Sequence, residues 1–296
     1  MDFLIEPKEL LETARRGDVV IVDTRKAADY AAGHISGAVN FSTYNTFALD
    51  TRAEGLSKFA RDVAALYAAA GVSSNRPVVV YEADTGMRSA RDVWILQYLG
   101  HPDARLLHGG LAAWRAAGCN LSSDAADDWT VGLRVRERAG MVIGYDEIVT
   151  RLGRPGITLL DVRDVDEHAG RDKTPCCARR GAIPGAVWIE WTRFLEGGRF
   201  KSAEAIRGLL RESGVDPESE IVPYCHRGAR SANTYYAMKY AGLPRVRNYI
   251  GSWHEWSARS ELPIERAEQL CQMSRGECAV RVPVGAVAHH GIEDDE

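Results

Sequence analysis

The residues best suited to chemistry lie in one short loop of the second half of the chain. The apolar run Ile221–Tyr224 leads directly into a segment composed of Cys225, His226, Arg227, Gly228, Ala229, Arg230 and Ser231. Where a buried strand passes through a short loop into a helix, backbone N–H groups converge and stabilise an anion. Such donors, with nearby Arg and protonated His, also lower the pKa of a thiol. The pattern therefore predicts a thiolate nucleophile at the loop centre and an oxyanion at its rim.

A related loop in the first half of the chain lacks the thiol. The segment Asp84–Ala90 is matched by His226–Ala232, with glycine, arginine and serine in the same places, and this alignment puts Ala83 opposite Cys225. The next two residues of the first loop, Asp84 and Thr85, replace two potential cations. A cysteine after a strand is often only a small buried hydrophobe. Because thiol and positive charge vary together between the copies, which packing does not require, we expect Cys225 to be reactive.

Two further pairs of segments show that the whole chain is an internal repeat. Ile21–Arg25 is matched by Leu159–Arg163, and Gly33–Val39 is matched by Gly181–Val187. A repeat of this length, present only twice, indicates two domains with separate cores rather than a solenoid. The sequence predicts an inactive first domain over residues 1–121, an active second domain over residues 129–266, and a tail over residues 267–296.

Within each copy, short apolar runs alternate with segments of helical periodicity. The expected strands are Val19–Val22, Pro77–Tyr81, Ala104–Leu107, Thr158–Asp161, Ile221–Tyr224 and Val246–Tyr249. The expected helices are Ser57–Ala70, Ser89–Leu99, Leu111–Ala117, Ala203–Glu212 and Ala229–Tyr240. This alternation predicts an α/β fold in which each domain is a parallel sheet flanked by helices. The working loops of such sheets follow the carboxyl ends of the strands.

Composition excludes several other classes of protein. The 296 residues are 45% hydrophobic and 26% charged, and the formal net charge is −4. That balance permits a folded core and argues against broad binding to nucleic acid. The sequence holds neither an apolar run of membrane-spanning length nor a signal peptide, so we expect a cytoplasmic protein. Six cysteines without a CxxC pair predict neither a disulfide scaffold nor a metal centre. No cofactor is expected.

Taken in order, these motifs resemble the rhodanese superfamily. The resemblance rests on the Asp-x-Arg pair of Asp161 and Arg163, Gly181–Ala186, the six-residue loop Cys225–Arg230, and Gly251–Trp256. It covers roughly residues 2–266 in both repeats. The closest pattern within the superfamily is that of tandem sulfurtransferases with an inactive first domain and an active second one.

The resemblance implies sulfur transfer by double displacement. The thiolate of Cys225 would attack the outer sulfur of thiosulfate, sulfite would leave, and cyanide or a thiol would then remove the sulfur from the persulfide. The substrate would be held by the loop residues His226, Arg227, Gly228, Ala229, Arg230 and Ser231. Family members often carry an arginine where this chain has Glu167. The inserted stretch could supply Arg179 or Arg180 as a substitute.

Three alternatives stay open at this point. The donor could be 3-mercaptopyruvate, although Arg227 beside the nucleophile favours the thiosulfate dianion. A Cys-loop phosphatase would need five residues between cysteine and arginine, whereas four separate Cys225 from Arg230. The chain could also be a sulfur carrier without turnover.

The remaining candidates are interpreted as structural. Asp23, Arg25, Asp161 and Arg163 are expected to tie loops together, and Trp253 and Trp256 to pack beside the active loop and the domain interface. Cys176 and Cys177 could resolve a persulfide, but unreactive surface thiols are the favoured interpretation. No role follows from the sequence for Cys271 and Cys278 in the tail.

Overall fold

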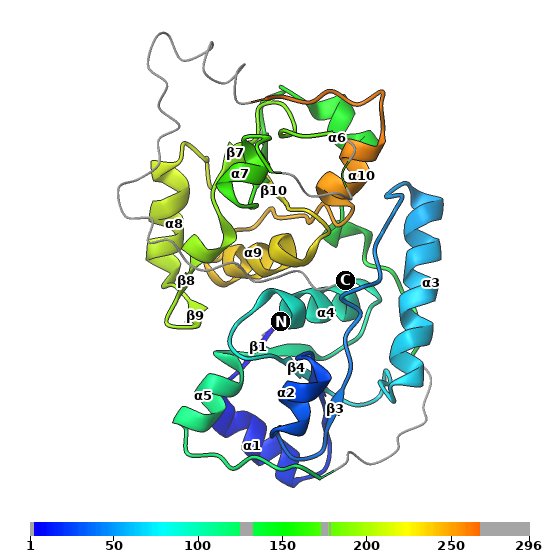
Figure 1. Cartoon of the computed structure of the whole chain (residues 1–296), viewed down its shortest axis with the longest axis vertical. Helices are drawn as coiled ribbons and strands as arrows, with labels where there is room; N and C mark the ends of the chain where they lie inside the picture. The colour runs from blue at the N-terminus through cyan, green and yellow to red at the C-terminus, as the bar shows by residue number, and fades with distance from the viewer. Residues whose placement is uncertain (1–2, 125–132, 173–176, 178, 267–296) are drawn as a thin grey trace.

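The computed structural model describes residues 3–124, 133–172, 177 and 179–266, and it consists of two α/β domains (Figure 1). The strands of the first domain are β1 (Leu4–Ile5), β2 (Val20–Asp23), β3 (Ala38–Asn40), β4 (Val78–Tyr81) and β5 (Ala104–Leu107). Its helices are α1 (Pro7–Arg15), α2 (Ala27–Ala31), α3 (Ala53–Ala69), α4 (Met87–Tyr98) and α5 (Gly110–Ala116).

The second domain also alternates strands with helices, but its main sheet has three strands and a small two-stranded hairpin is added. Its strands are β6 (Ile157–Asp161), β7 (Val187–Trp188), β8 (Leu195–Glu196), β9 (Arg199–Phe200) and β10 (Glu220–Tyr224). Its α-helices are α6 (Tyr145–Arg151), α7 (Val165–His168), α8 (Ala203–Glu212), α9 (Ala229–Tyr240) and α10 (Ser252–Ala258). Two 3-10 turns, η1 (Ala139–Met141) and η2 (Trp191–Phe194), complete it.

The main sheets are parallel, as the alternating pattern predicts. The first sheet has the order β1-β5-β4-β2-β3, and the second has the order β10-β6-β7. In both sheets two matching strands end side by side. Asp23 at the end of β2 lies opposite Tyr81 of β4, and Asp161 at the end of β6 lies opposite Tyr224 of β10. The chain therefore leaves β10 at the carboxyl edge of the sheet, where Cys225 begins the loop that the sequence predicts to be active.

The prediction of a strand over Val246–Tyr249 is wrong. Residues of this segment make only isolated bridges, among them Val246 to Ile221. The reason lies in the neighbouring strand β10, which contains Pro223. Tyr249 N–H donates to the carbonyl of Pro223 at 3.2 Å, but proline has no N–H to return a bond to the segment. The ladder is interrupted at this residue, and the segment runs beside the sheet without completing it.

Helices α4 and α9 pack against each other where the two domains meet (Figure 1). Asn233 in α9 donates hydrogen bonds to the carbonyls of Thr85 (2.8 Å) and Gly86 (3.1 Å) in the first domain. Buried apolar side chains of both domains form one continuous cluster there, which includes Trp94 of α4 and Tyr236 of α9. This shared core fixes the first domain against the active loop of the second.

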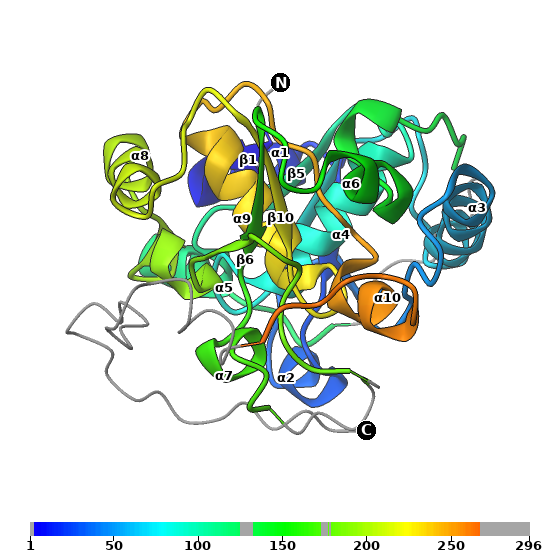
Figure 2. The ribbon, with the colours of Figure 1, turned by 90° about the horizontal axis from the view of Figure 1, so that it is seen from above.

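A second contact joins the domains beside the active loop. Thr51, just before α3, donates its N–H and its hydroxyl to the buried carboxylate of Glu255 in α10, both at 2.7 Å. Seen from above, α3 and α10 lie on the same side of the molecule (Figure 2). The segment that leads into α3 therefore closes over the second domain next to the Cys225 loop.

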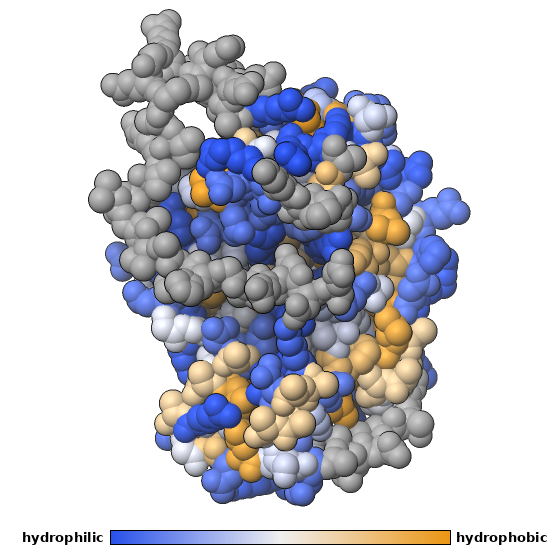
Figure 3. Space-filling model, viewed as in Figure 1, coloured by the Kyte–Doolittle hydropathy of each residue, from blue (hydrophilic) through white to orange (hydrophobic). Residues whose placement is uncertain are grey.

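The face viewed in Figure 3 is mixed in character. Hydrophilic residues predominate over the second domain, while most hydrophobic residues in this view gather over the first domain. Among the described residues, no helix combines the length and apolar character needed to cross a membrane.

Candidate active site

Cys225 occupies the predicted position, directly between β10 and α9. Its side chain is buried, and its Sγ accepts a hydrogen bond from the backbone N–H of Gly228 at 3.1 Å. Gly228 has φ +89°, and a Cβ there would lie 2.7 Å from the carbonyl oxygen of Ile250. Only glycine fits this turn without strain. The loop thus aims an amide and the N-terminus of a helix at the sulfur.

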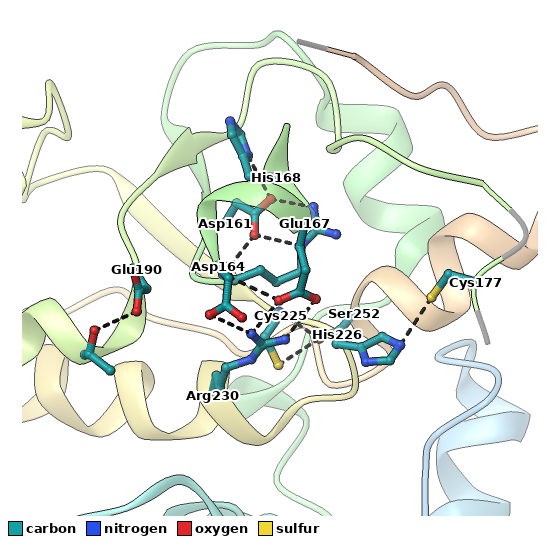
Figure 4. Close-up of polar contacts among 12 residues, drawn as sticks. Asp161, Asp164, Glu167, His168, Cys177, Glu190, Cys225, His226, Arg230 and Ser252 are labelled. Atoms are coloured by element: carbon teal, nitrogen blue, oxygen red, sulfur yellow. Dashed lines mark hydrogen bonds and ion pairs between the residues drawn. The ribbon is translucent and has the colours of Figure 1, made fainter. Parts of the chain in front are cut away.

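Ser252 holds the loop from the opposite side. Its hydroxyl oxygen accepts the N–H of Cys225 at 3.1 Å and donates to the carbonyl of Tyr249 at 2.8 Å. Its Oγ lies 3.9 Å from the sulfur, too far for a strong bond (Figure 4). Ser252 is the one described non-glycine residue with a positive φ, +55°. This conformation, which costs free energy, lets the serine at the start of α10 hold the backbone of Cys225.

Arg230 is engaged by carboxylates rather than left open to a substrate. Its guanidinium contacts Glu167 at 2.5 and 3.0 Å and Asp164 at 3.3 Å (Figure 4). Burial alone would lower the pKa of Arg230, but attraction to Glu167 raises it above its ordinary value. Glu167, the residue that departs from the family pattern, therefore neutralises the arginine of the loop.

Arg227 faces the first domain. Its Cζ lies 4.4 Å from the centroid of the Phe47 ring, and its Nε is buried without a hydrogen-bond partner among the described residues. This is cation–π geometry. A charge on Cys225 also interacts electrostatically with the buried Arg91 of α4. The first domain thus contributes two groups to the surroundings of the thiol.

His226 is a neutral residue in this setting. Burial, followed by the positive charges of Arg227 and Arg230, lowers the pKa of His226 to about 3. Its Nε2 lies 3.2 Å from the sulfur of Cys177. The imidazole of His254 packs edge-on to it with ring centroids 5.9 Å apart. At neutral pH, then, His226 adds hydrogen-bonding capacity but no charge.

The Asp-x-Arg pairs tie loops together, as expected. Arg163 bonds Asp161 through two nitrogens and donates to the carbonyl of Gly181 at 2.8 Å. Burial alone would raise the pKa of Asp161, but the charge of Arg163 and a hydrogen bond from His168 hold it well below its usual range. In the first domain Arg25 bonds Asp23 and the carbonyl of Gly33 in the same manner.

The two tryptophans pack beside the Cys225 loop, as predicted, but in a core cluster of the second domain rather than in the cluster that joins the two domains. Trp253 and Trp256 belong to one buried apolar cluster with Tyr224, and the N–H of Trp253 donates to the carbonyl of Cys225 at 2.9 Å. The Cζ of Arg163 lies 4.7 Å from the ring of Trp253. These contacts hold the start of α10 against Cys225.

The two arginines of the inserted stretch have different surroundings. Arg179 donates to backbone carbonyls of Trp256, Ser257, Arg259 and Leu262. Arg180 is exposed, and with Arg163, Glu167 and His226 it lines a small pocket beside the loop. Cys176, Cys271 and Cys278 lie outside the described residues.

The hydrogen bonds correct the alignment of the two loops. The N–H of Leu111 donates to the carbonyl of Glu82 at 2.8 Å, and the matching N–H of Trp253 donates to the carbonyl of Cys225. Glu82, not Ala83, is therefore the structural counterpart of Cys225. The first loop holds one more residue before its glycine than the second. An alignment fixed on the later glycine and arginine hides that extra residue.

Glu82 fills the anion position of its own loop. Its carboxylate accepts the N–H groups of Arg88 (2.9 Å) and Ser89 (3.1 Å) at the start of α4, as well as the Ser89 hydroxyl (3.0 Å). Burial nevertheless raises the pKa of Glu82 to about 7. The first domain thus carries an internal carboxylate where the second presents a thiol.

Several of these residues were not identified from the sequence. Ser252 lies within the motif Gly251–Trp256, so its place beside tryptophan offered a signal. Glu82 follows a strand just as Cys225 does, and counting from the strand end would have found it. Phe47 and Arg91 give no sequence signal, because only the packing of one domain on the other brings them to the site.

Fold and site together define a tandem α/β protein in which one strand-to-helix loop of the second domain is centred on a cysteine. The family model described as Rhodanese-like domain matches residues 6–117 and again residues 145–259. The chain belongs to the rhodanese family, and both of its domains are members.

Individual relatives agree in length and fold. A thiosulfate sulfurtransferase of Azotobacter vinelandii is 32% identical over 268 residues, which are 90% of this chain and 97% of the relative. A sulfur carrier protein of Thermus thermophilus is 31% identical over 81% of this chain and 88% of its own length. The crystal structure of a 3-mercaptopyruvate sulfotransferase from Escherichia coli superposes with a TM-score of 0.72 at 22% identity, covering 86% of this chain and 99% of that one.

Proposed function

We propose that the protein is a sulfurtransferase that moves a sulfane sulfur from thiosulfate to cyanide or a thiol through a persulfide on Cys225. The observation that carries the proposal is the Gly228 N–H directed at Sγ from the start of α9. A helix N-terminus stabilises an anion at this place, first as thiolate and then as persulfide. The similarity to thiosulfate sulfurtransferases over nearly the whole chain supports the same activity.

The reaction is a double displacement in which sulfur changes partners twice. The Cys225 thiolate attacks the outer sulfur of thiosulfate, and the sulfur–sulfur bond breaks with its electron pair leaving on sulfite. The acceptor then attacks the outer sulfur of the persulfide and returns the electron pair to Cys225. Because the side chain of Cys225 is buried, a neighbouring side chain must move to admit the sulfur donor. This requirement favours a small donor molecule.

Charge supports thiosulfate as the donor. Arg230 is matched by Glu167 and His226 is neutral, so Arg227 is the loop residue that brings net positive charge to a dianion. We therefore assign the sulfonate end to Arg227 and the amides of residues 226–230, with Arg180 at the pocket as a second cation. We assign structural roles to Arg179 and Arg230, because backbone carbonyls hold Arg179 and carboxylates hold Arg230.

We further propose that the first domain takes no part in the chemistry. Glu82 cannot accept a sulfane sulfur as a thiolate does, and its carboxylate fills the position where an anion would bind. The cytoplasmic location stays a prediction from the sequence.

Thiocyanate formation from thiosulfate and cyanide tests the proposal. Cys225→Ala should lower turnover by roughly 10³-fold or more, while Cys119→Ala, a change at another free cysteine of the described chain, should keep it. Parallel assays with 3-mercaptopyruvate should give the lower kcat/KM of the two donors. Turnover retained by Cys225→Ala would reject the mechanism, and a single stoichiometric release without turnover would identify a carrier.

A further inference from the structure

Three side chains with metal-ligating atoms converge beside the active loop. They are Cys177 from the inserted stretch, His226 from the loop, and His254 from α10, and their ligand atoms all lie within 4.8 Å of one another. In Figure 4 the thiol of Cys177 points at the imidazole of His226. The three residues come from separate parts of the sequence, which explains why cysteine spacing alone predicted no metal centre.

The donor set and spacing suit a small d10 cation. Zn²⁺ binds thiolate at about 2.3 Å and imidazole at about 2.0–2.1 Å, so its tetrahedral ligands lie roughly 3.3–3.7 Å apart. The Cys177–His226 separation of 3.2 Å is already close to this range. Side-chain shifts of about 1 Å would bring His254 to the same tetrahedral spacing from the other two ligands. One soft sulfur and two imidazoles also suit Cu⁺.

One ring nitrogen of His254 is available to an ion. Nδ1 of His254 is buried and has no hydrogen-bond partner among the described residues. Of the nearby cations, Arg230 is matched by Glu167, which leaves Arg227 and the pocket residue Arg180 to oppose an incoming ion.

We propose that Cys177, His226 and His254 form a three-ligand site for Zn²⁺ or Cu⁺, with the fourth position open. Binding displaces the proton of the Cys177 thiol and adds a thiolate bond to two imidazole bonds. Because His226 directly follows the nucleophile, the bound ion lies at the entrance to the loop and blocks the sulfur donor. This inhibitory consequence rests on the proposed function, whereas the site itself does not.

Spectroscopy with Co²⁺ as a probe tests the site without any assay of activity. The starting protein is the full chain with Cys225→Ser, which removes the catalytic thiol as a competing ligand. One Co²⁺ per chain should give tetrahedral d–d bands with a thiolate charge-transfer band, and Zn²⁺ should displace it. Cys177→Ser should abolish the charge-transfer band, and His254→Gln should weaken binding by at least about tenfold.

Matched controls separate this site from other thiols. Cys176→Ser, at the neighbouring residue, and the double change Cys271→Ser with Cys278→Ser should leave the spectrum unchanged. An unaltered spectrum in Cys177→Ser or in His254→Gln would overturn the proposal. In the chain with its native Cys225, Zn²⁺ should inhibit sulfur transfer reversibly with EDTA, and His254→Gln should resist inhibition at the same Zn²⁺ concentration. If sulfur transfer itself is absent, the Co²⁺ spectrum still decides the site.

Discussion

The ring of Phe47 in the first domain should set the position of Arg227 in the active loop. The Arg227 Cζ lies 4.4 Å from the ring centroid, inside the roughly 6 Å reach of a cation–π contact. With its Nε buried and unpaired among the described residues, this guanidinium depends on the ring for its placement. For a half-buried cation such a contact contributes about 1 kcal/mol, which is roughly fivefold in kcat/KM.

The substitution Phe47→Leu removes the ring face and keeps most of the apolar volume. We expect kcat/KM for thiosulfate to fall roughly fivefold, mainly through KM, in the thiocyanate assay. Phe41→Leu is the matched control, because the Phe41 ring packs on Tyr67 within the first domain, and its kinetics should stay near those of the wild type.

A double-mutant cycle with Arg227→Ala decides whether the effect passes through the arginine. Once Arg227 is gone, Phe47→Leu should have almost no further effect, which corresponds to a coupling energy of about 1 kcal/mol. The same fivefold loss in the Arg227→Ala background would refute the reasoning, since the ring would then act by some other route.

Three further predictions concern stability and the loop. Folding raises the pKa of Glu82 from its ordinary value of 4.5 to about 7, so between these pH values the native state binds more protons than the unfolded state. The free energy of unfolding should therefore fall by up to about 3 kcal/mol as the pH rises through this window. Glu82→Gln should remove that fall when urea titrations at pH 5 and pH 8 are compared. Glu167→Gln leaves Arg230 without its main partner and should cost about 2 kcal/mol in urea unfolding, whereas a cost near zero would show that the pair contributes nothing. Gly228→Ala should lower the melting temperature and abolish thiocyanate formation, because its Cβ would meet the Ile250 carbonyl at a positive φ; wild-type melting and activity would show that the loop tolerates a side chain.

Local patterns were enough to predict much of the fold. Helices α8 and α9 have the predicted bounds, Ala203–Glu212 and Ala229–Tyr240. Helix α8 has one apolar face, and each helix is followed by a glycine within two residues of its end. The helix expected over Ser57–Ala70 begins earlier, at Ala53. The failure at Val246–Tyr249 depends on the missing N–H of Pro223 in another strand, which apolar content alone does not reveal.

The candidate site was predictable only where it is local. The Cys225 loop follows from a strand, a glycine and a helix that are contiguous in sequence. The partners of its charged residues cannot be predicted in this way. Glu167 reaches Arg230 across the sheet edge, and Phe47 reaches Arg227 across the domain interface. The Ala83 assignment failed for a different reason: the first loop has one added residue, so Glu82 occupies the place that matches Cys225 while the motif that follows is unchanged.

The most direct test of the central claim is to locate the transferred sulfur on the protein. The chain is incubated with thiosulfate without an acceptor, freed of small molecules, and digested for mass spectrometry. The peptide that contains Cys225 should gain one sulfur atom, and added cyanide should remove it as one equivalent of thiocyanate. An unmodified Cys225 peptide, or the sulfur on Cys177 or Cys119 instead, would contradict the account.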